Sequence, residues 1–512
     1  MTVITQALRW FGHRVNPIVV RELRQTVRSR FVTSIFMLLL VAMLGATSIF
    51  AIALRMDGGD MSLAAGEDIT MTIVGILFFV CMLFVPIYTG LRLVFERRGV
   101  QADLMFITTL SPGAVIRGKM LSAMMLSLLI FSACLPFLTF TYLLRGVDLP
   151  ALLLGLAFGF LGVIVATQVA LFFATLPMGI TFRVLLSLGG VVGMGFGAAA
   201  LTMAASELQY FGLTYNTDFW IVAGMILLGA GLTVGLLYVL SVAILSPPSA
   251  NRTLPVRLFL AGLWGVTLLV ACGLAIYESE WDIVVFGWTM LVLPIFLVAF
   301  FVSLCERQEW GPRIRRHIPA TSLSQLVAFL FYSGAAGGIV WSLLMLAATL
   351  TVSYAAYGLS GGATARLDSE SLRYLLLMCL YPLAYGFSAF LLWLGVFKRW
   401  FSHHHIWVIA LSIAMVCTLL PFIASLLYTS PMRYYRNTNP LMLLSPVSLI
   451  VDDRSFALSL TFVAFWAGTT GLVVFAWAAG RLGRFTPLVR TAAPTAPVTT
   501  DTDTDTREAN DG

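Results

Sequence analysis

Charged residues are scarce in this chain of 512 residues, where they make up 11% of the sequence against 59% hydrophobic residues. Soluble globular domains carry about 25% charged residues. The composition therefore excludes a soluble protein and predicts an integral membrane protein. Lysine is the rarest charged residue, and Lys119 and Lys398 are the two in the sequence. The net charge of +7 therefore comes from arginine. The arginines lie beside apolar runs, which indicates contact with a membrane surface and no nucleic-acid partner.

Motifs for catalysis or metal binding are also missing. There is no HExxH motif and no pair of carboxylates within an apolar run. The six cysteines form no CxxC pair and lie in or beside apolar runs, which is typical of small apolar side chains. The consecutive histidines 403–405 point in different directions around a helix, which favours interfacial placement over metal ligation. We therefore predict no enzyme activity, catalytic site, metal or cofactor in this chain.

Apolar runs of about 20 residues, enough to cross a bilayer, recur along the whole chain. They are centred within 31–54, 70–94, 114–144, 150–176, 179–204, 219–245, 257–277, 283–304, 326–356, 374–397, 406–428 and 456–480. This pattern predicts an all-α polytopic membrane protein with about twelve transmembrane helices. No Asp, Glu, Lys, Arg or His lies near the centre of a run. Ion-coupled secondary transporters usually keep such residues there to bind and release charge, so that class is disfavoured.

Basic residues are distributed unevenly over the connections between these runs. Most of them fall on the side of the N-terminus, and the loop around Arg433 and Arg436 is the exception. The positive-inside rule then predicts a multi-pass protein of the cell membrane with both termini in the cytoplasm.

The first 30 residues predict a cytoplasmic interfacial helix. Asn16-Pro17 supplies a cap and a first-turn proline. Beyond it, Arg21, Arg24 and Arg28 share one helical face, where they can meet lipid phosphates. A solvated basic arm is the alternative.

Two six-span halves are expected after this helix. The first half covers residues 31–245, and a cytoplasmic linker covers residues 246–256. The second half covers residues 257–480, and a disordered cytoplasmic tail follows at 481–512. Glu306-Arg307 follows the second run of the second half as Glu96-Arg97 follows that of the first, which indicates a diverged repeat. The stretch 306–317 is either a second coupling segment or a positive-inside anchor.

The longest charged interruption in the first half is 95–120. Ser111-Pro112 predicts a helix start, with the hydroxyl as cap and proline at the first position. Before it, Leu104 and Ile107 fall on one stripe of a short helix lying along the membrane face. We expect Glu96 to pair with a basic residue of a soluble partner or with its neighbour Arg97.

This interruption resembles a known family. Glu96-Arg97-Arg98-Gly99, the run LMFITTLSP at 104–112, Ile116-Arg117-Gly118-Lys119 and the LPF at 135–137 are similar to membrane subunits (permeases) of type-2 ABC exporters. The similarity covers roughly 7–147, departs from the family pattern at Val100-Gln101 and fades in the second half.

The resemblance implies a permease subunit that is energised by a separate ABC-type ATPase subunit. That ATPase subunit would hold ATP and Mg²⁺. The permease would form a homodimer or assemble with a second permease. It places the ATPase-coupling contact at Glu96, Arg97, Gly99, Leu104, Ile107, Ser111, Pro112, Gly118 and Lys119. Within this stretch, 113–119 matches a P-loop except that Met120 replaces the Mg²⁺-binding hydroxyl and no strand precedes it. A secondary transporter and a non-transporting membrane scaffold are the alternatives, and the substrate is left open, although apolar spans fit a lipid-like cargo.

Overall fold

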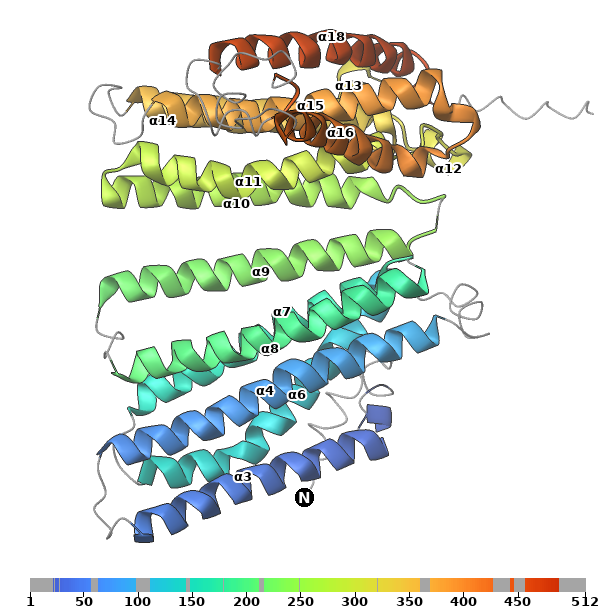
Figure 1. Ribbon diagram of the computed structural model, residues 1–512. Helices are drawn as coiled ribbons and strands as arrows, with labels where there is room; N and C mark the ends of the chain where they lie inside the picture. The colour runs from blue at the N-terminus through green and yellow to red at the C-terminus, as the bar shows by residue number, and fades with distance from the viewer. Residues whose placement is uncertain are drawn as a thin grey trace, which may run out of the picture. The chain divides into compact units, whose positions relative to one another are not determined.

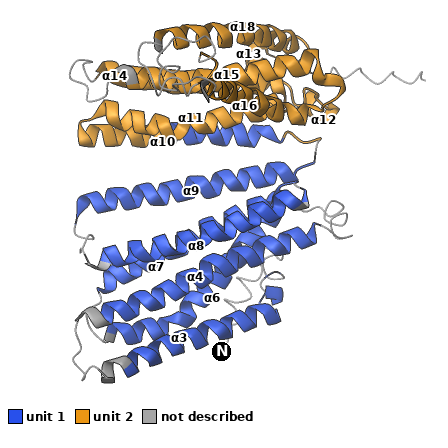
Figure 2. Ribbon diagram, viewed as in Figure 1, with its two compact units in different colours: residues 1–248, 252–266 blue, residues 249–251, 267–512 orange. Residues whose placement is uncertain are grey.

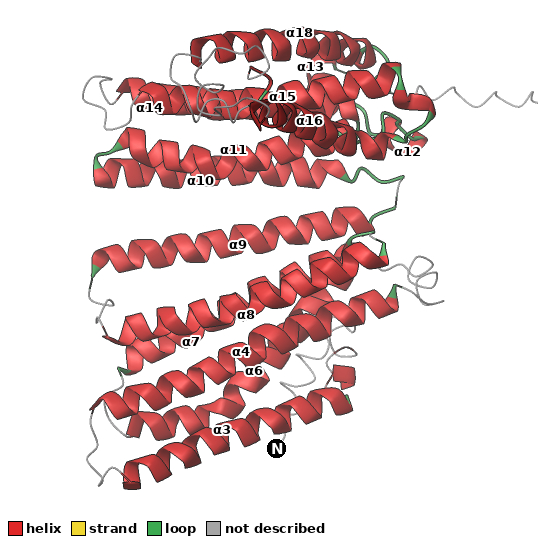
Figure 3. Ribbon diagram, in the orientation of Figure 1, coloured by secondary structure: helices red, strands yellow, loops and turns green. Residues whose placement is uncertain are grey.

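A computed structural model describes the chain at residues 22, 24–26, 28–56, 63–97, 111–143, 148–177, 179–210, 216–247, 249–319, 321–359, 369–426, 443–445 and 456–487. These residues form helices and some of the loops between them, and they include no strand (Figure 3). Twelve helices in the described ranges are long and apolar enough to cross a membrane. The predicted all-α fold with about twelve transmembrane helices is confirmed.

The chain divides into two compact units (Figure 2). Unit 1 comprises residues 1–248 and 252–266, and unit 2 comprises residues 249–251 and 267–512. The boundary falls around the proline-containing connection after residue 245, and it divides the helix that follows this connection.

Unit 1 is built around one long central helix (Figure 1). Its helices are α3 (Arg30–Met56), α4 (Leu63–Glu96), α6 (Pro112–Leu143), α7 (Leu149–Thr175), α8 (Ile180–Tyr210) and α9 (Thr217–Leu245). Helix α4 packs against α3, α6, α7 and α8. Fully buried residues of α4, such as Ile73, Leu77 and Phe78, form the centre of the apolar core.

The seam between α4 and α7 depends on glycine. A Cβ atom on Gly159 of α7 would stand 2.1 Å from the Phe78 ring, and one on Gly90 of α4 would stand 3.2 Å from the Ala170 carbonyl oxygen. Small residues let helix backbones approach closely where burial of apolar surface cannot drive association within the bilayer. These glycines therefore hold the two helices at short range.

Several buried hydroxyls within the unit 1 spans are satisfied inside the same helix. The hydroxyls of Thr70, Thr89, Ser127 and Thr167 each donate to the carbonyl oxygen four residues earlier, at 2.7–2.9 Å. An unsatisfied polar group in hydrocarbon costs several kcal/mol (about 2–7). Internal bonding therefore lets these hydroxyls sit in apolar surroundings.

Unit 2 has a comparable set of long helices and several short ones. They are α10 (Thr253–Glu278, shared with unit 1), α11 (Trp281–Leu304), α12 (Pro312–Arg315), α13 (Ser322–Phe331), α14 (Ala335–Leu359), α15 (Ser369–Gly395), η2 (Phe397–Arg399), η3 (His403–His405), α16 (Ile406–Leu426) and α18 (Phe456–Leu482). Helix α11 pairs with α14, and α15 pairs with α16 and α18.

The apolar run expected within 326–356 is interrupted. Helix α13 ends at Phe331 and α14 begins at Ala335. Between them Gly334 has φ of +154°, a backbone conformation that side chains with a Cβ rarely adopt. Glycine therefore permits a sharp break that hydropathy alone does not reveal. The membrane-spanning part of the expected run is Ala335–Leu359.

The two units share an order of helix pairings. In unit 1 the second span, α4, packs on the third span, α6, and on the fourth, α7. The fourth span packs on the fifth, α8, and on the sixth, α9, and the third span packs on the sixth. In unit 2 the corresponding pairs are α11 with α14 and α15, α15 with α16 and α18, and α14 with α18. This correspondence is what a diverged repeat predicts.

Candidate functional site

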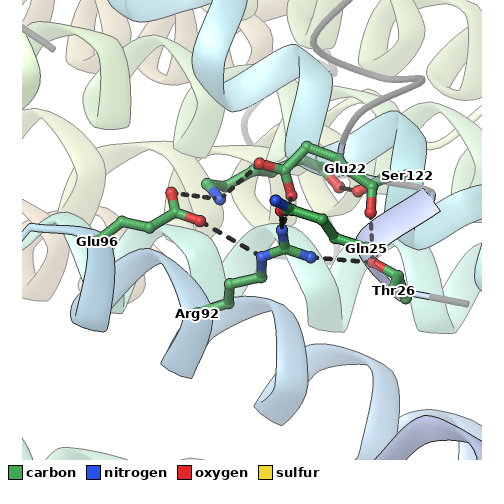
Figure 4. Close-up of polar contacts among 7 residues, drawn as sticks. Glu22, Gln25, Thr26, Arg92, Glu96 and Ser122 are labelled. Atoms are coloured by element: carbon green, nitrogen blue, oxygen red, sulfur yellow. Dashed lines mark hydrogen bonds and ion pairs between the residues drawn. The ribbon is translucent and has the colours of Figure 1, made fainter. Parts of the chain in front are cut away.

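Four charged side chains from three segments meet where α4 ends and α6 begins (Figure 4). Glu22 comes from the N-terminal segment, Arg92 and Glu96 from the last turns of α4, and Lys119 from the second turn of α6. We call these four residues the charged cluster. The cluster brackets the connection between α4 and α6, which the sequence singled out.

Each cation of the charged cluster lies between both carboxylates. Lys119 Nζ is 2.7 Å from Glu96 Oε2 and 3.4 Å from Glu22 Oε1. Arg92 Nη2 is 3.2 Å from Glu22 Oε2, and Arg92 Nε is 3.3 Å from Glu96 Oε1. Two positive and two negative groups thus close an alternating ring with no net charge.

The charged cluster is largely removed from solvent. The Lys119 side chain is 2% exposed, and those of Glu22, Arg92 and Glu96 are 13%, 19% and 27% exposed. A buried ion costs several kcal/mol (about 3–5 when one partner of a pair is lost) unless counter-ions and hydrogen bonds compensate. Lys119 therefore depends on both carboxylates.

Neutral side chains complete the hydrogen bonding around Arg92. Its Nη1 donates to Thr26 Oγ1 at 3.1 Å, and its Nη2 donates to Gln25 Oε1. Thr26, itself buried, donates its hydroxyl to the Glu22 carbonyl oxygen at 2.8 Å. Arg92 thereby fixes one turn of the N-terminal segment on the end of α4.

Little free space remains among these side chains. The cavity beside Glu22, Arg92 and Lys119 measures about 10 Å³, close to the least that one water needs (about 10–15 Å³). The charged cluster can hold three segments together, but it has no room for a substrate.

Arg97, directly after α4, connects the same end of the unit to α7. Its Nη1 donates at 2.8 Å to the carbonyl oxygen of Ala174, in the last turn of α7. A cation there is favoured because the final carbonyls of a helix lack partners and carry partial negative charge. Burial, and then the nearby positive charge of Arg183, lower the pKa of the Arg97 guanidinium below its usual range.

Arg117 makes a further connection, from α6 to α9. Its Nη1 donates to the Tyr238 hydroxyl at 3.0 Å. A Cβ on Gly113 would stand 2.8 Å from that same oxygen, so glycine makes the approach possible. Beneath these contacts, buried Leu93, Ile116 and Leu171 pack together.

The structure brings together some of the predicted coupling residues. Glu96 and Lys119 are in direct contact, whereas Arg97 turns to α7. Within its own chain Glu96 pairs with Lys119 and Arg92 instead of the expected Arg97, because both cations converge on it. Pairing of Glu96 with a basic residue of a partner stays a prediction. Gly99, Leu104 and Ile107 lie outside the described residues.

The predicted helix start is confirmed. Helix α6 begins at Pro112, and the Ser111 hydroxyl accepts from the Ala114 N–H at 3.3 Å. Gly118 and Lys119 therefore lie within a regular helix. The stretch 113–119 forms no phosphate-binding loop, and its lysine is already ion-paired.

The N-terminal arginines are described only in part. Arg24 and Arg28 are exposed, and Arg21 lies outside the described residues. Exposure leaves both described guanidinium groups open to lipid phosphates or to water.

Glu22, Arg92 and Thr26 are residues of the candidate site that the sequence analysis does not predict. Arg92 and Glu96 are four residues apart, the spacing at which side chains meet on a helix, so that pair could have been found. Glu22 and Lys119 are 97 residues apart, and no local pattern predicts their contact.

In the second half, the corresponding acid Glu306 contacts the break between α13 and α14. Glu306 Oε2 accepts from the Gly334 N–H at 3.0 Å, and Gln308 Oε1 accepts from the Ala336 N–H at 2.7 Å. Trp310 Nε1 donates to the Ser333 carbonyl oxygen at 2.7 Å. The stretch after α11 thus satisfies backbone groups at the break before α14, which are orphaned wherever a helix begins.

Comparison with known proteins adds no family: no family model, no curated protein and no solved structure matches this chain. Among the described residues, no group of three His, Cys, Asp or Glu side chains could hold a metal ion.

Proposed function

We propose that this chain is the membrane-spanning permease subunit of an ATP-binding-cassette transporter, acting as an exporter and energised by a separate ATPase subunit. The ATPase would dock on the connection between α4 and α6. The observation that carries the proposal is the charged cluster, which joins both ends of that connection to each other and to the N-terminal segment.

Mechanical coupling is the activity that this arrangement suits. A soluble partner that moves the connection would pull on Glu96 at the end of α4 and on the first turns of α6. Since Lys119 contacts both Glu96 and Glu22, α4, α6 and the N-terminal segment would move together. Arg97 would carry the displacement to α7 through the Ala174 carbonyl.

An external energy source also agrees with the charge distribution. In the described parts of the twelve candidate spans, every Asp, Glu, Lys and Arg lies toward a span end. A transporter driven by an ion gradient usually needs a titratable group near the membrane midplane. A permease driven by ATP hydrolysis in a partner does not.

The test is co-purification of the ATPase with substituted chains. Truncating a well-packed interface anchor typically costs about 2 kcal/mol or more, roughly thirtyfold in affinity. We expect Leu104→Ala combined with Ile107→Ala to lose the ATPase at unchanged expression. Leu128→Ala with Leu129→Ala is the matched control, because these leucines of α6 are 56% and 42% exposed and lie away from the connection.

If Leu104 and Ile107 only pack on the ends of this chain's own spans, their double variant will lose thermal stability and expression while the remaining protein keeps its ATPase. That result would refute the proposed docking site. An essential titratable residue at the middle of a span would instead refute the proposed energy source.

A further inference from the structure

A large apolar cavity lies within unit 1, away from the charged cluster. It measures about 1080 Å³ and is walled by α7, α8 and the first half of α9. Representative lining residues are Val169 of α7, Leu185 and Gly193 of α8, and Val222 and Ile226 of α9. Its volume stands at the upper end of small-molecule sites, which span about 300–1,000 Å³.

Missing side chains on α8 create this space. Gly189 and Gly193 line the cavity, and a Cβ on either would meet no atom within 4 Å. Apolar side chains that line the cavity are also exposed: Leu185 is 66% exposed and Ile226 is 52% exposed. Exposed apolar side chains such as these can make dispersion contacts with an apolar occupant, so an apolar occupant is favoured.

The cavity is elongated along the helices. Its lining on α7 runs from Gly155 to Phe173, about 27 Å at 1.5 Å per residue. That length is close to the hydrocarbon thickness of a bilayer, about 30 Å. A long hydrocarbon chain fits this shape better than a compact molecule does.

The glycines do not form a continuous surface for another helix. Gly189, Gly193 and Gly197 are spaced by four residues, as in helix-packing motifs. However, the position of a Gly197 Cβ is already approached by Met82 Cε of α4, at 3.1 Å. Part of the surface formed by these three glycines is thus already covered within unit 1, which favours a thin, flexible occupant over a helix.

One charged residue lines the cavity. Glu207 stands near the C-terminal end of α8, and all the other lining residues are glycine, alanine or larger apolar types. Phe219 of α9 lines the cavity as well and forms a ring contact with Trp220 at 5.3 Å. A carboxylate in apolar surroundings attracts an ammonium group by charge.

We propose that this cavity binds one amphipathic lipid, with its hydrocarbon between α7, α8 and α9 and an ammonium headgroup at Glu207. Burial alone cannot select such a ligand, because the surrounding lipid tails are as apolar as the cavity wall. Selectivity therefore comes from Glu207, and the class of ligand is a phospholipid of the ethanolamine type. The site needs no ATPase, so it goes beyond the proposed function and is tested without it.

The probe is a phosphatidylethanolamine with a photoactivatable diazirine in its acyl chain, added to the purified full chain in phosphatidylglycerol nanodiscs. Cross-linked peptides are mapped by mass spectrometry. We expect labelling on the facing sides of α7, α8 and α9. Unlabelled phosphatidylethanolamine should compete, and extra phosphatidylglycerol should not.

Two variants separate the hydrocarbon from the headgroup. Gly193→Leu narrows the cavity at its glycine wall and should reduce labelling of α8 there, whereas Gly195→Leu should keep it, since Gly195 is on the same helix, has equally open surroundings and does not line the cavity. Glu207→Gln should keep labelling but lose the preference for phosphatidylethanolamine. Gly189→Leu repeats the first test should Gly193→Leu fail to fold.

Three results would overturn the proposal. The first is equal competition by both phospholipids in the unsubstituted chain, and the second is unchanged labelling in both Gly193→Leu and Gly189→Leu. The third is efficient disulfide cross-linking of two chains through Gly193→Cys, in a background without the native cysteines, because a second copy would then occupy the space.

Discussion

At the scale of the residue, Lys119 shows how a membrane chain with two lysines uses one of them. Its ammonium is 2% exposed and touches two carboxylates, whereas Lys398 in η2 is exposed. The two lysines therefore form a matched pair for experiment. Lys119 holds segments together at the end of a helix bundle, and Lys398 is exposed to solvent or lipid headgroups.

Lys119→Ala should lower the stability of the chain by about 3 kcal/mol, because removing one partner of a buried ion pair leaves the other uncompensated. Glu22 and Glu96 would then share Arg92 alone. Thermal unfolding of the purified chain measures this, with Lys398→Ala as the control. Equal, small changes in both variants would show that the charged cluster contributes nothing to stability.

The isolated chain should hydrolyse no ATP and bind none tightly. Its P-loop-like stretch lacks the hydroxyl that would bind Mg²⁺, and its lysine is already ion-paired. Turnover by the purified chain should equal that of a detergent blank, and Lys119→Ala should leave nucleotide binding unchanged. Tight, specific ATP binding that Lys119→Ala abolishes would contradict this expectation.

At the scale of the element, the sequence predicted what depends on local chemistry. Hydropathy located the spans, and the cap at Ser111 located the start of α6. The break at Gly334 escaped notice because an apolar run continues through it. The contact of Glu22 with Lys119 escaped because it joins segments far apart in the chain. Long-range pairings follow from how helices pack, which a single sequence does not display.

Gly159→Leu should disrupt the packing of α4 on α7. Even a Cβ at this position would stand 2.1 Å from the buried Phe78 ring, and overpacking of a core typically costs about 1–3 kcal/mol. Gly224→Leu in α9 is the control, because a Cβ there meets nothing within 4 Å. Unfolding temperatures of both variants in detergent give the comparison, and equal values would mean that the seam accommodates the added atoms.

At the scale of the whole molecule, two units of six long helices carry a shared order of helix pairings, but the charged cluster belongs to the first. In the second unit, Glu306 accepts a hydrogen bond from the Gly334 N–H at a helix break. The proposed coupling contact lies in the first unit, and the stretch 306–317 stays either a second coupling segment or a positive-inside anchor.

The proposed orientation in the cell membrane predicts a labelling pattern. In a background without the native cysteines, Gly58→Cys and Glu280→Cys should react from outside with an impermeant maleimide. Gln101→Cys and Glu309→Cys should react only after permeabilisation, because basic residues concentrate on the cytoplasmic side. External labelling at residue 101 would invert the arrangement and put the charged cluster out of reach of a cytoplasmic ATPase.

The central claim is that a separate ATPase drives this chain through the connection between α4 and α6. A photo-crosslinking amino acid placed at Leu104 in living cells tests it most directly, with Leu128 of α6 as the control position. We predict that Leu104 captures a soluble polypeptide with an ATP-binding cassette, identified by mass spectrometry, and that Leu128 captures none. If Leu104 captures only lipid or this chain's own spans, while the protein is correctly inserted, the account is contradicted.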